Sequence, residues 1–240
     1  MNSNALFHHV EIVAHRGYAA VHPENTMEAF RRALELGADS LEIDVHHSKE
    51  GIPVVIHDDT LDRTTDGTGP VREKTIEELQ QVDAGTKFKP EFAGCRIPLL
   101  EEVLELCGGT VGLQLELKER ITEGEARALL HLLTNYRMTE RTMVISFHPD
   151  NLRLVRSLHH NIELGWLSDK PVDLAPLQEL GRATLLLQHG VVQRQPDIVQ
   201  AAEAAGIGLG VWTIRDLQDA YRLVRLGVRR LTSDIPLYRD

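Results

Sequence analysis

Eight short apolar runs, most of them followed by an amphipathic stretch, are the feature of this 240-residue sequence that most restricts its fold. Each run is rich in leucine or β-branched residues, which predicts a buried strand. The predicted strands are Ile12–Ala14, Leu41–Val45, Val111–Leu117, Met143–Phe147, Ile162–Leu167, Ala183–Leu187, Ile207–Trp212 and Val228–Thr232. Eight strand–helix units in a chain of this length favour an α/β fold, the (β/α)8 (TIM) barrel. A doubly wound open sheet is the alternative, but no G-x-G-x-x-G motif follows the first strand.

The stretches between the strands carry helix start and stop signals. In the stretch Thr26–Leu36 we expect a helix with Asn25 as N-cap, Glu28 reaching back from the third position and Gly37 as the stop. Three further stretches follow the same plan, namely Asp150–Leu158, Pro196–Ala205 and Arg215–Leu226.

One segment interrupts this regular pattern. After the second strand the chain continues through a hairpin arm, Pro53–Ile56, and then through residues 58–97, which are punctuated by glycine and proline. A long excursion inside a compact domain is usually functional. We therefore predict a single domain over residues 1–240, with an insertion at 58–97 near the barrel mouth.

Charge, hydropathy and cysteine content exclude several classes of protein. The net charge of −10 argues against a nucleic acid or an anionic membrane as partner. No apolar run reaches the roughly 20 residues of a membrane-spanning helix, and no leader pattern opens the chain. Cys95 and Cys107 are too few for a disulfide framework and lack zinc-site spacing, so we expect two reduced thiols in a cytoplasmic protein. Whether copies of the chain form a homo-oligomer stays open.

Two neighbouring strands of the predicted barrel direct acidic side chains to one face. In "LEIDV", Glu42 and Asp44 lie two residues apart and therefore leave the same face of the strand. In "GLQLELK", Gln114, Glu116 and Lys118 share a face in the same way. Because barrel active sites form at the carboxyl ends of the strands, we expect three carboxylates and one ammonium group to converge there.

Such a cluster needs a counter-charge. Three buried carboxylates repel one another and are poorly solvated, and a divalent cation would relieve both effects. An all-oxygen ligand set suits Mg²⁺, Ca²⁺ or Mn²⁺ better than zinc. A structural network of ion pairs with arginine or lysine is the alternative interpretation.

Two of the twelve histidines stand out by position. His15 and His57 each end an apolar run, "IVAH" and "VVIH", and would lie at the rim toward which the acids point. No histidine lies two positions from another, which argues against the H-x-H pattern of zinc hydrolases and favours general acid–base catalysis. Arg16 and Lys118 suit a phosphate group that also touches a metal, or alternatively balance the charge of the acids.

The motifs taken together identify a resemblance. The chain contains "HRG" at 15–17, "PENT" at 23–26, "EID" at 42–44 and "GIPVVIHDDTLDRTTDGTG" at 51–69. In this order and spacing they resemble the glycerophosphodiester phosphodiesterases. The likeness spans the whole chain and is strongest over residues 12–118. It implies a (β/α)8 barrel with an extra segment after the second strand.

The resemblance also implies roles for single residues and one divalent cation, either Mg²⁺ or Ca²⁺, with Mn²⁺ as a further option. The residues that match the family's functional positions are the metal ligands Glu42, Asp44 and Glu116, the catalytic residues His15, His57 and Arg16, and the substrate-binding residues Arg16, Lys118, Phe147 and Trp212.

The implied reaction is the hydrolysis of small glycerophosphodiesters, such as glycerophosphocholine or glycerophosphoethanolamine, to sn-glycerol 3-phosphate and an alcohol. We expect His15 to activate the neighbouring glycerol hydroxyl and His57 to protonate the leaving alcohol, with a cyclic phosphate as intermediate. One alternative is a lysophospholipase D-like phosphodiesterase acting on lysophospholipids. Another is a non-catalytic barrel that binds phosphodiesters, although binding alone does not require two proton-transfer groups.

The chain departs from the family pattern at two places. "HHSKEG" follows Asp44 where a threonine and an aspartate are usual, and "WTIR" at 212–215 lacks a common asparagine. No proposed catalytic group is lost, so these departures bear on substrate preference. His46, which shares a strand face with Asp44, and Glu24 are left without an assigned role.

Overall fold

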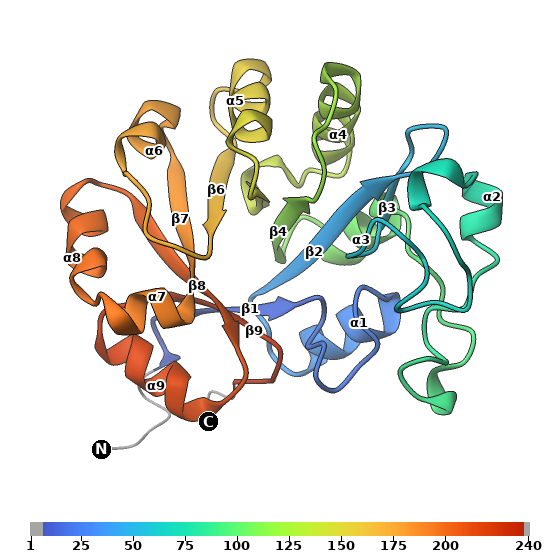
Figure 1. The fold of residues 1–240 in the computed structure, drawn as a ribbon, viewed down its shortest axis with the longest axis horizontal. Helices are drawn as coiled ribbons and strands as arrows, with labels where there is room; N and C mark the ends of the chain where they lie inside the picture. Colours follow the sequence, from blue (N-terminus) through green and yellow to red (C-terminus); the bar gives the residue numbers. More distant parts are fainter. Residues whose placement is uncertain (1–6, 238–240) are drawn as a thin grey trace.

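The structure, a computed structural model, describes residues 7–237, and in it eight parallel strands close into a barrel (Figure 1). Hydrogen-bonded neighbours run in the order β1-β9-β8-β7-β6-β5-β4-β2, and β1 pairs with β2 to complete the ring. The strands are β1 Glu11–His15, β2 Ser40–His47, β4 Gly112–Leu117, β5 Thr142–Ser146, β6 Glu163–Ser168, β7 Ala183–Gln188, β8 Gly208–Ile214 and β9 Arg230–Ser233. The predicted (β/α)8 barrel is confirmed, and the predicted strands differ from these mainly at their ends.

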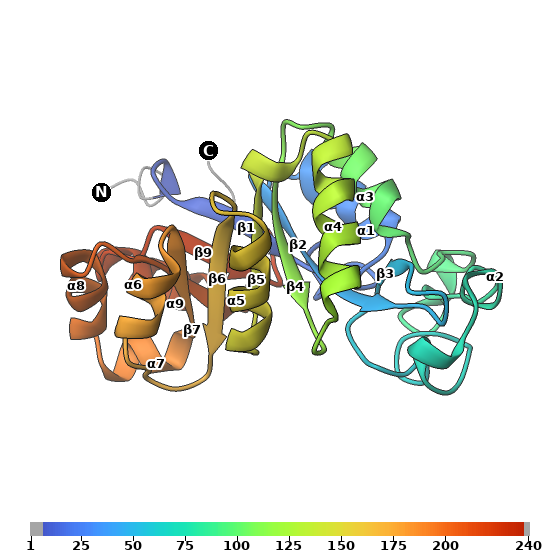
Figure 2. The same cartoon turned by 90° about the horizontal axis from the view of Figure 1, so that it is seen from above.

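Helices cover the outside of the barrel (Figure 2). They are α1 Met27–Glu35, α3 Leu100–Cys107, α4 Glu123–Asn135, α5 Pro149–Leu158, α6 Ala175–Leu180, α7 His189–Arg194, α8 Asp197–Ala204 and α9 Leu217–Arg225. The apolar side chains on the outer face of β2, Leu41, Ile43 and Val45, are fully buried in the same cluster as Phe30 of α1. The core therefore lies between strands and helices and leaves the inner strand face for other groups.

Helix α1 begins one residue later than predicted, because Thr26 and not Asn25 is its N-cap. The Thr26 hydroxyl accepts a hydrogen bond from the backbone N–H of Ala29 at 3.2 Å. Asn25 instead takes a left-handed backbone conformation and directs its amide to Asp44, which accepts a hydrogen bond from Nδ2 at 2.8 Å. The residue expected to start the helix therefore belongs to the interior of the barrel mouth. The predicted stop is correct, since Gly37 follows the helix with φ of 84°.

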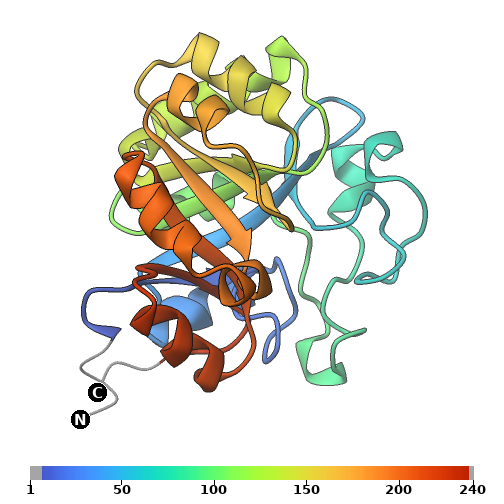
Figure 3. The same ribbon diagram turned by 60° about the vertical axis from the view of Figure 1, so that its left-hand side comes forward.

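The segment between β2 and α3 stands beside the barrel (Figure 3). It contains β3 Pro53–Val55, which pairs antiparallel with the end of β2, followed by the short helices η2 Val71–Glu73, α2 Ile76–Leu79 and η3 Pro90–Phe92. Its apolar side chains form a cluster of their own, made of Val54, Ile56, Leu61, Val71, Leu79, Ala84 and Ile97. Pairing with the carboxyl end of β2 brings this segment to the mouth of the barrel.

An ion-pair cluster ties the segment to the barrel. Arg72 of η2 donates hydrogen bonds to Glu119 at 2.6 Å and to Glu125 at 2.8 Å. His47, at the end of β2, also hydrogen-bonds Glu119, at 3.3 Å. Burial would raise the pKa of Glu119, but the bonds from His47 and Arg72 prevail and lower it to about 2.

Among residues 7–237, no helix combines the length and apolar character needed to cross a membrane.

We expect Phe30→Ala to lower the free energy of unfolding by about 3–5 kcal/mol, because it leaves a cavity between α1 and the barrel. Chemical denaturation monitored by circular dichroism measures the change. The neighbouring Arg31 is exposed, so Arg31→Ala is the matched control and should leave stability almost unchanged. Equal effects of the two substitutions would contradict the packing described here.

The Glu119 cluster should make stability depend on pH in acid. A carboxyl group whose pKa is lowered by folding stabilises the protein above its unfolded pKa, and this contribution disappears as pH falls through the folded value. Glu119→Gln should therefore be less stable than the wild type at pH 7, and the difference should shrink between pH values of about 4.5 and 2. Thermal melts across this range test it, and a difference that does not vary with pH would refute it.

Candidate active site

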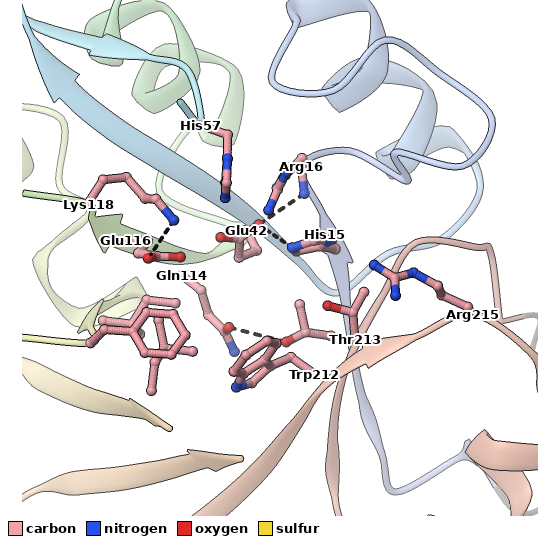
Figure 4. Close-up of a pocket in the computed structure, with 14 residues that line it drawn as sticks. His15, Arg16, Glu42, His57, Gln114, Glu116, Lys118, Trp212, Thr213 and Arg215 are labelled. Carbon is pink, nitrogen blue, oxygen red and sulfur yellow. Dashed lines mark hydrogen bonds and ion pairs between the residues drawn. The ribbon is translucent and has the colours of Figure 1, made fainter. Parts of the chain in front are cut away.

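A cavity of about 250 Å³ opens at the carboxyl ends of the barrel strands (Figure 4). The sequence-predicted site residues that line it are His15, Arg16, Glu42, His57, Glu116, Lys118, Phe147 and Trp212. The ninth, Asp44, is completely buried directly behind the lining, within ion-pair distance of Arg16 and Lys118. The structure thus brings all nine predicted residues together, although they come from elements spread over almost the whole chain.

The cavity has one polar and one apolar wall. Strands β1, β2 and β4, with the residues that follow β1, β3 and β4, supply most of the charged groups, and Arg215, which follows β8, adds one more. Strands β5, β6 and β8 supply Ile145, Phe147, Leu167 and Trp212. The rings of Phe147 and Trp212 meet edge to face with centroids 5.4 Å apart, and the indole N–H donates to the carbonyl of Leu186 at 3.0 Å. A bound molecule therefore meets charge on one side and hydrocarbon on the other.

Three carboxylates form the centre of the polar wall. Glu42, Asp44 and Glu116 each place an oxygen within 4.8 Å of the other two, because β2 and β4 pair Asp44 opposite Glu116. Burial and the charges of the neighbouring acids raise the pKa of Glu42 well above its usual range. For the same reasons the pKa of Glu116 is raised to about 7. Burial also opposes ionisation of Asp44, but Arg16 and Lys118 prevail and lower its pKa.

The two basic residues neutralise this cluster only in part. The Arg16 Nε atom lies 3.1 Å from Asp44 Oδ2, and Lys118 Nζ lies 2.9 Å from Glu116 Oε1. The second Asp44 oxygen, Oδ1, is buried and has no hydrogen-bond partner among residues 7–237, although Lys118 Nζ is 3.4 Å away. Three acids facing two cations, with one carboxylate oxygen unbonded, fit a divalent cation with oxygen ligands. The ion-pair interpretation accounts for part of the cluster but not for this oxygen.

Each of the two histidines is held by a carboxylate at Nδ1. His15 ends β1 and its Nδ1 lies 2.5 Å from Asp234 Oδ1, while its Nε2 lies 3.9 Å from Glu42. His57 follows β3 and its Nδ1 lies 2.6 Å from Asp58 Oδ1. A carboxylate at Nδ1 keeps the proton on that nitrogen, so in the neutral ring Nε2 is free to accept one. The pair can therefore move protons on both sides of a group bound between them.

Sequence reasoning missed three groups that support this geometry. Asp58 and Asp234 orient the histidines, and Asn25 bonds the buried Asp44. A signal existed for the two aspartates, since Asp58 follows His57 directly in "HDD" and Asp234 follows the predicted last strand in "LTSDIP". The side-chain direction of Asn25 carried no such signal, because capping residues are usually satisfied by their own helix.

Glu24 and His46, which the sequence left unassigned, lie around the cavity and are not among its lining residues. Glu24 accepts hydrogen bonds from Arg16 at 3.0 Å and from Arg63 at 2.7 Å, and so joins the first strand's loop to the segment after β3. The His46 Nε2 atom lies 3.1 Å from the backbone carbonyl of His57. Both residues brace the groups that line the cavity.

Comparison with known proteins places the geometry in context. A model of the Glycerophosphoryl diester phosphodiesterase family matches residues 15–237. A glycerophosphodiester phosphodiesterase of Caldanaerobacter subterraneus subsp. tengcongensis is 37% identical over 228 residues, covering 94% of each chain. One from Bacillus altitudinis is 34% identical over 235 residues, covering 94% of this chain and 95% of the other. A solved phosphodiesterase of Oleispira antarctica, in complex with the product sn-glycerol-3-phosphate, superposes with a TM-score of 0.87 at 32% identity, covering 94% of this chain and 93% of that one.

The raised pKa of Glu116 generates a test of the acid cluster. A carboxyl group whose pKa rises on folding stabilises the protein fully below the unfolded value, and this contribution is lost as pH rises through the folded value of about 7. The metal-free protein should therefore lose stability as pH rises from about 4.5 to 8. The Glu116→Gln variant should lose less stability over the same range, because it has no carboxyl group at this position to ionise. Thermal melts in chelator measure this.

Added Mg²⁺ or Ca²⁺ should raise the melting temperature of the wild type at pH 8 and have little effect on Glu116→Gln. The exposed Glu140 offers a matched control, since Glu140→Gln should respond to the cation like the wild type. Identical pH and metal responses of wild type and Glu116→Gln would refute this role of the cluster.

Proposed function

The chain belongs to the glycerophosphoryl diester phosphodiesterase family and is a phosphoric diester hydrolase, and we propose that it cleaves small glycerophosphodiesters to sn-glycerol 3-phosphate and an alcohol. Glycerophosphocholine and glycerophosphoethanolamine represent the substrate class. The observation that carries the proposal is the pair of carboxylate-held histidines facing one cavity with three clustered acids. Binding alone would require none of this proton-transfer machinery.

Arg16 and Lys118 bind the phosphoryl oxygens in this proposal. Both side chains line the cavity and both are anchored by the acid cluster, so that their cationic groups are already oriented before substrate enters. Preorganised cations stabilise the charge that builds on phosphorus during reaction more effectively than solvent does. Arg16 is held further by Glu24, which accepts a hydrogen bond from its Nη1 atom.

Glu42, Asp44 and Glu116 hold one divalent cation, Mg²⁺ or Ca²⁺, with Mn²⁺ as a further option. The bound cation supplies Lewis-acid stabilisation of negative charge on the phosphoryl group. Oxygen-only ligands, together with the unbonded Asp44 oxygen, support this assignment.

The two histidines exchange protons with the substrate. His15 removes the proton from the glycerol hydroxyl next to the phosphate, and that oxygen bonds to phosphorus while the bond to the head-group oxygen breaks. His57 gives its proton to the departing alcohol. Burial lowers the pKa of His57, whereas Asp58 and the negative charge of the bound diester favour its protonated form. Water then opens the cyclic phosphate as His57 takes its proton and His15 returns one to the glycerol oxygen.

The attacking hydroxyl is part of the substrate, so the first step avoids the entropy loss of bringing two molecules together. Well-oriented intramolecular reactions gain up to about 7–11 kcal/mol in this way. The chain need only hold the glycerol in one conformation, with its phosphate on the polar wall and its carbon backbone toward Phe147 and Trp212.

A second substrate class has one observation in its favour. The apolar wall formed by Ile145, Phe147, Leu167 and Trp212 suits a lysophospholipid chain as well as a glycerol backbone. Turnover of deacylated and acylated substrates, measured side by side, separates the two functions.

We interpret residues 58–97 as an insertion into a single domain of residues 1–240. This segment supplies Asp58, which holds His57 at the barrel mouth. It also supplies Arg63, which donates hydrogen bonds to both Asp58 and Glu24. Cys95 and Cys107 are not joined in a disulfide, and we infer a cytoplasmic location, where such thiols stay reduced.

To test the proposal, the purified protein is stripped with chelator and assayed on a panel of glycerophosphodiesters with Mg²⁺, Ca²⁺ and Mn²⁺ in turn. Release of sn-glycerol 3-phosphate is the readout. We expect no turnover without metal and recovery with at least one of the three. Activity unchanged by chelator would contradict the metal assignment, and the absence of product under all conditions would contradict the function.

His15→Gln and His57→Gln should each reduce kcat by about 10²–10⁴-fold without loss of folding. The exposed His131 provides the control, since His131→Gln should keep wild-type turnover.

A glycerol phosphodiester of p-nitrophenol distinguishes the roles of His15 and His57, because p-nitrophenolate leaves without needing a proton. In single-turnover assays, His57→Gln should recover the release of p-nitrophenol and His15→Gln should not, whereas equal recovery would refute the assignment of acid and base in the first step.

A further inference from the structure

The floor of the cavity contains a polar group that the proposed mechanism does not use. Gln114 of β4 is 2% exposed and lines the same cavity as the catalytic histidines (Figure 4). Its Oε1 accepts a hydrogen bond from the Thr232 hydroxyl at 3.3 Å, but its Nε2 has no partner anywhere in residues 7–237. Buried amide groups are almost always hydrogen-bonded, so the unpaired end of this amide indicates a missing ligand.

The position of Gln114 indicates what that ligand is. The pairing of β2 with β4 sets Gln114 beside Glu42 and Glu116 beside Asp44, so Gln114 is level with Glu42 and lies one inward-facing step deeper than Asp44 and Glu116. A glycerophosphodiester with its phosphate at Arg16 and Lys118 extends its glycerol toward this floor. The hydroxyl next to the phosphate is consumed by the reaction, which leaves the terminal hydroxyl, farthest from phosphorus, to reach the floor.

We propose that Gln114 is a specificity-determining residue that hydrogen-bonds the terminal hydroxyl of the substrate's glycerol. This inference rests on the function proposed above, and it gives the unpaired amide N–H group of Gln114 a partner in a cavity that Ile145 and Trp212 also line. A site built to bond a hydroxyl discriminates strongly against an analogue without it, because the buried partner is then left unpaired. Gln114 thus selects a free glycerol group over other diols.

The same contact separates glycerophosphodiesters from lysophospholipids. In a lysophospholipid acylated at the terminal oxygen, the fatty chain would have to continue past Gln114 into the barrel. Beneath it lies a second cavity of about 280 Å³, which Gln114 also lines. Its lining is largely polar, and Arg230 pairs there with Glu11 and Glu163 at 2.5 and 3.1 Å. A fatty chain that continued past Gln114 would displace the glycerol hydroxyl from the amide and meet these charged groups, so such acylated substrates should be cleaved more slowly than glycerophosphodiesters.

The test compares glycerophosphoethanolamine with 2-hydroxypropyl phosphoethanolamine, which lacks only the terminal hydroxyl. We expect the wild type to have a kcat/KM at least about 10²-fold lower for the analogue. Gln114→Met, which keeps the length and removes the amide, should lose activity on the glycerol substrate but not on the analogue. The matched control is Gln178→Met, at an exposed glutamine on α6, which should retain the wild-type preference.

Two results would overturn the inference while leaving the proposed function intact. One is equal turnover of both substrates by the wild type, as expected if the amide binds water only. The other is a Gln114→Met variant that folds and keeps the wild-type preference.

If the wild type cleaves neither substrate, the proposed function fails, and binding decides the inference separately. Calorimetry in Mg²⁺ then compares sn-glycerol 3-phosphate with 2-hydroxypropyl phosphate. A preference for the first that disappears in Gln114→Met supports the role of the amide, and equal affinities overturn it.

Discussion

The barrel mouth is organised around the burial of more negative than positive charge. Glu42, Asp44 and Glu116 are almost inaccessible to solvent, yet within residues 7–237 Arg16 and Lys118 are the only arginine or lysine side chains that pair with them. The backbone around them is shaped to maintain this arrangement. The turn after β1 puts Arg16 and Gly17 at positive φ, and a Cβ atom at Gly17 would lie 2.7 Å from that of Ala29. The turn therefore requires glycine, and it seats Arg16 against the acids.

The two histidines are positioned by very different means. The partner of His57 is the next residue, Asp58, so both members of that pair belong to the segment after β3. The partner of His15 lies 219 residues away and reaches it only because β9 pairs with β1. The geometry of one proton-transfer group thus depends on the added segment, and that of the other depends on closure of the ring. Arg215 joins this second pair by donating to the free oxygen of Asp234 at 2.8 Å.

The barrel and seven of the nine predicted site residues could be anticipated from the sequence because their signals are local, whereas Phe147 and Trp212 followed only from the resemblance to the family. Alternation along a strand shows which side chains face inward, and the end of an apolar run shows where they emerge. The supporting contacts could not be anticipated in the same way. Asn25 looked like a helix cap, and the bond from its amide to Asp44 exists only once α1 packs beside β2. The pairing of Gln114 with Thr232, 118 residues away, likewise depends on tertiary structure.

Closure by the last strand has a consequence for the order in which the enzyme becomes competent during synthesis. The chain leaves the ribosome from its N-terminus, so the acid cluster, Arg16, His57 and Lys118 all emerge while β9 and Asp234 are still unmade. Until then β1 has no partner on one side and the Nδ1 atom of His15 has no carboxylate. A nascent chain can thus hold a nearly full set of catalytic side chains and still be idle. The carboxylate of Asp234, which follows the last strand of the barrel, completes the site.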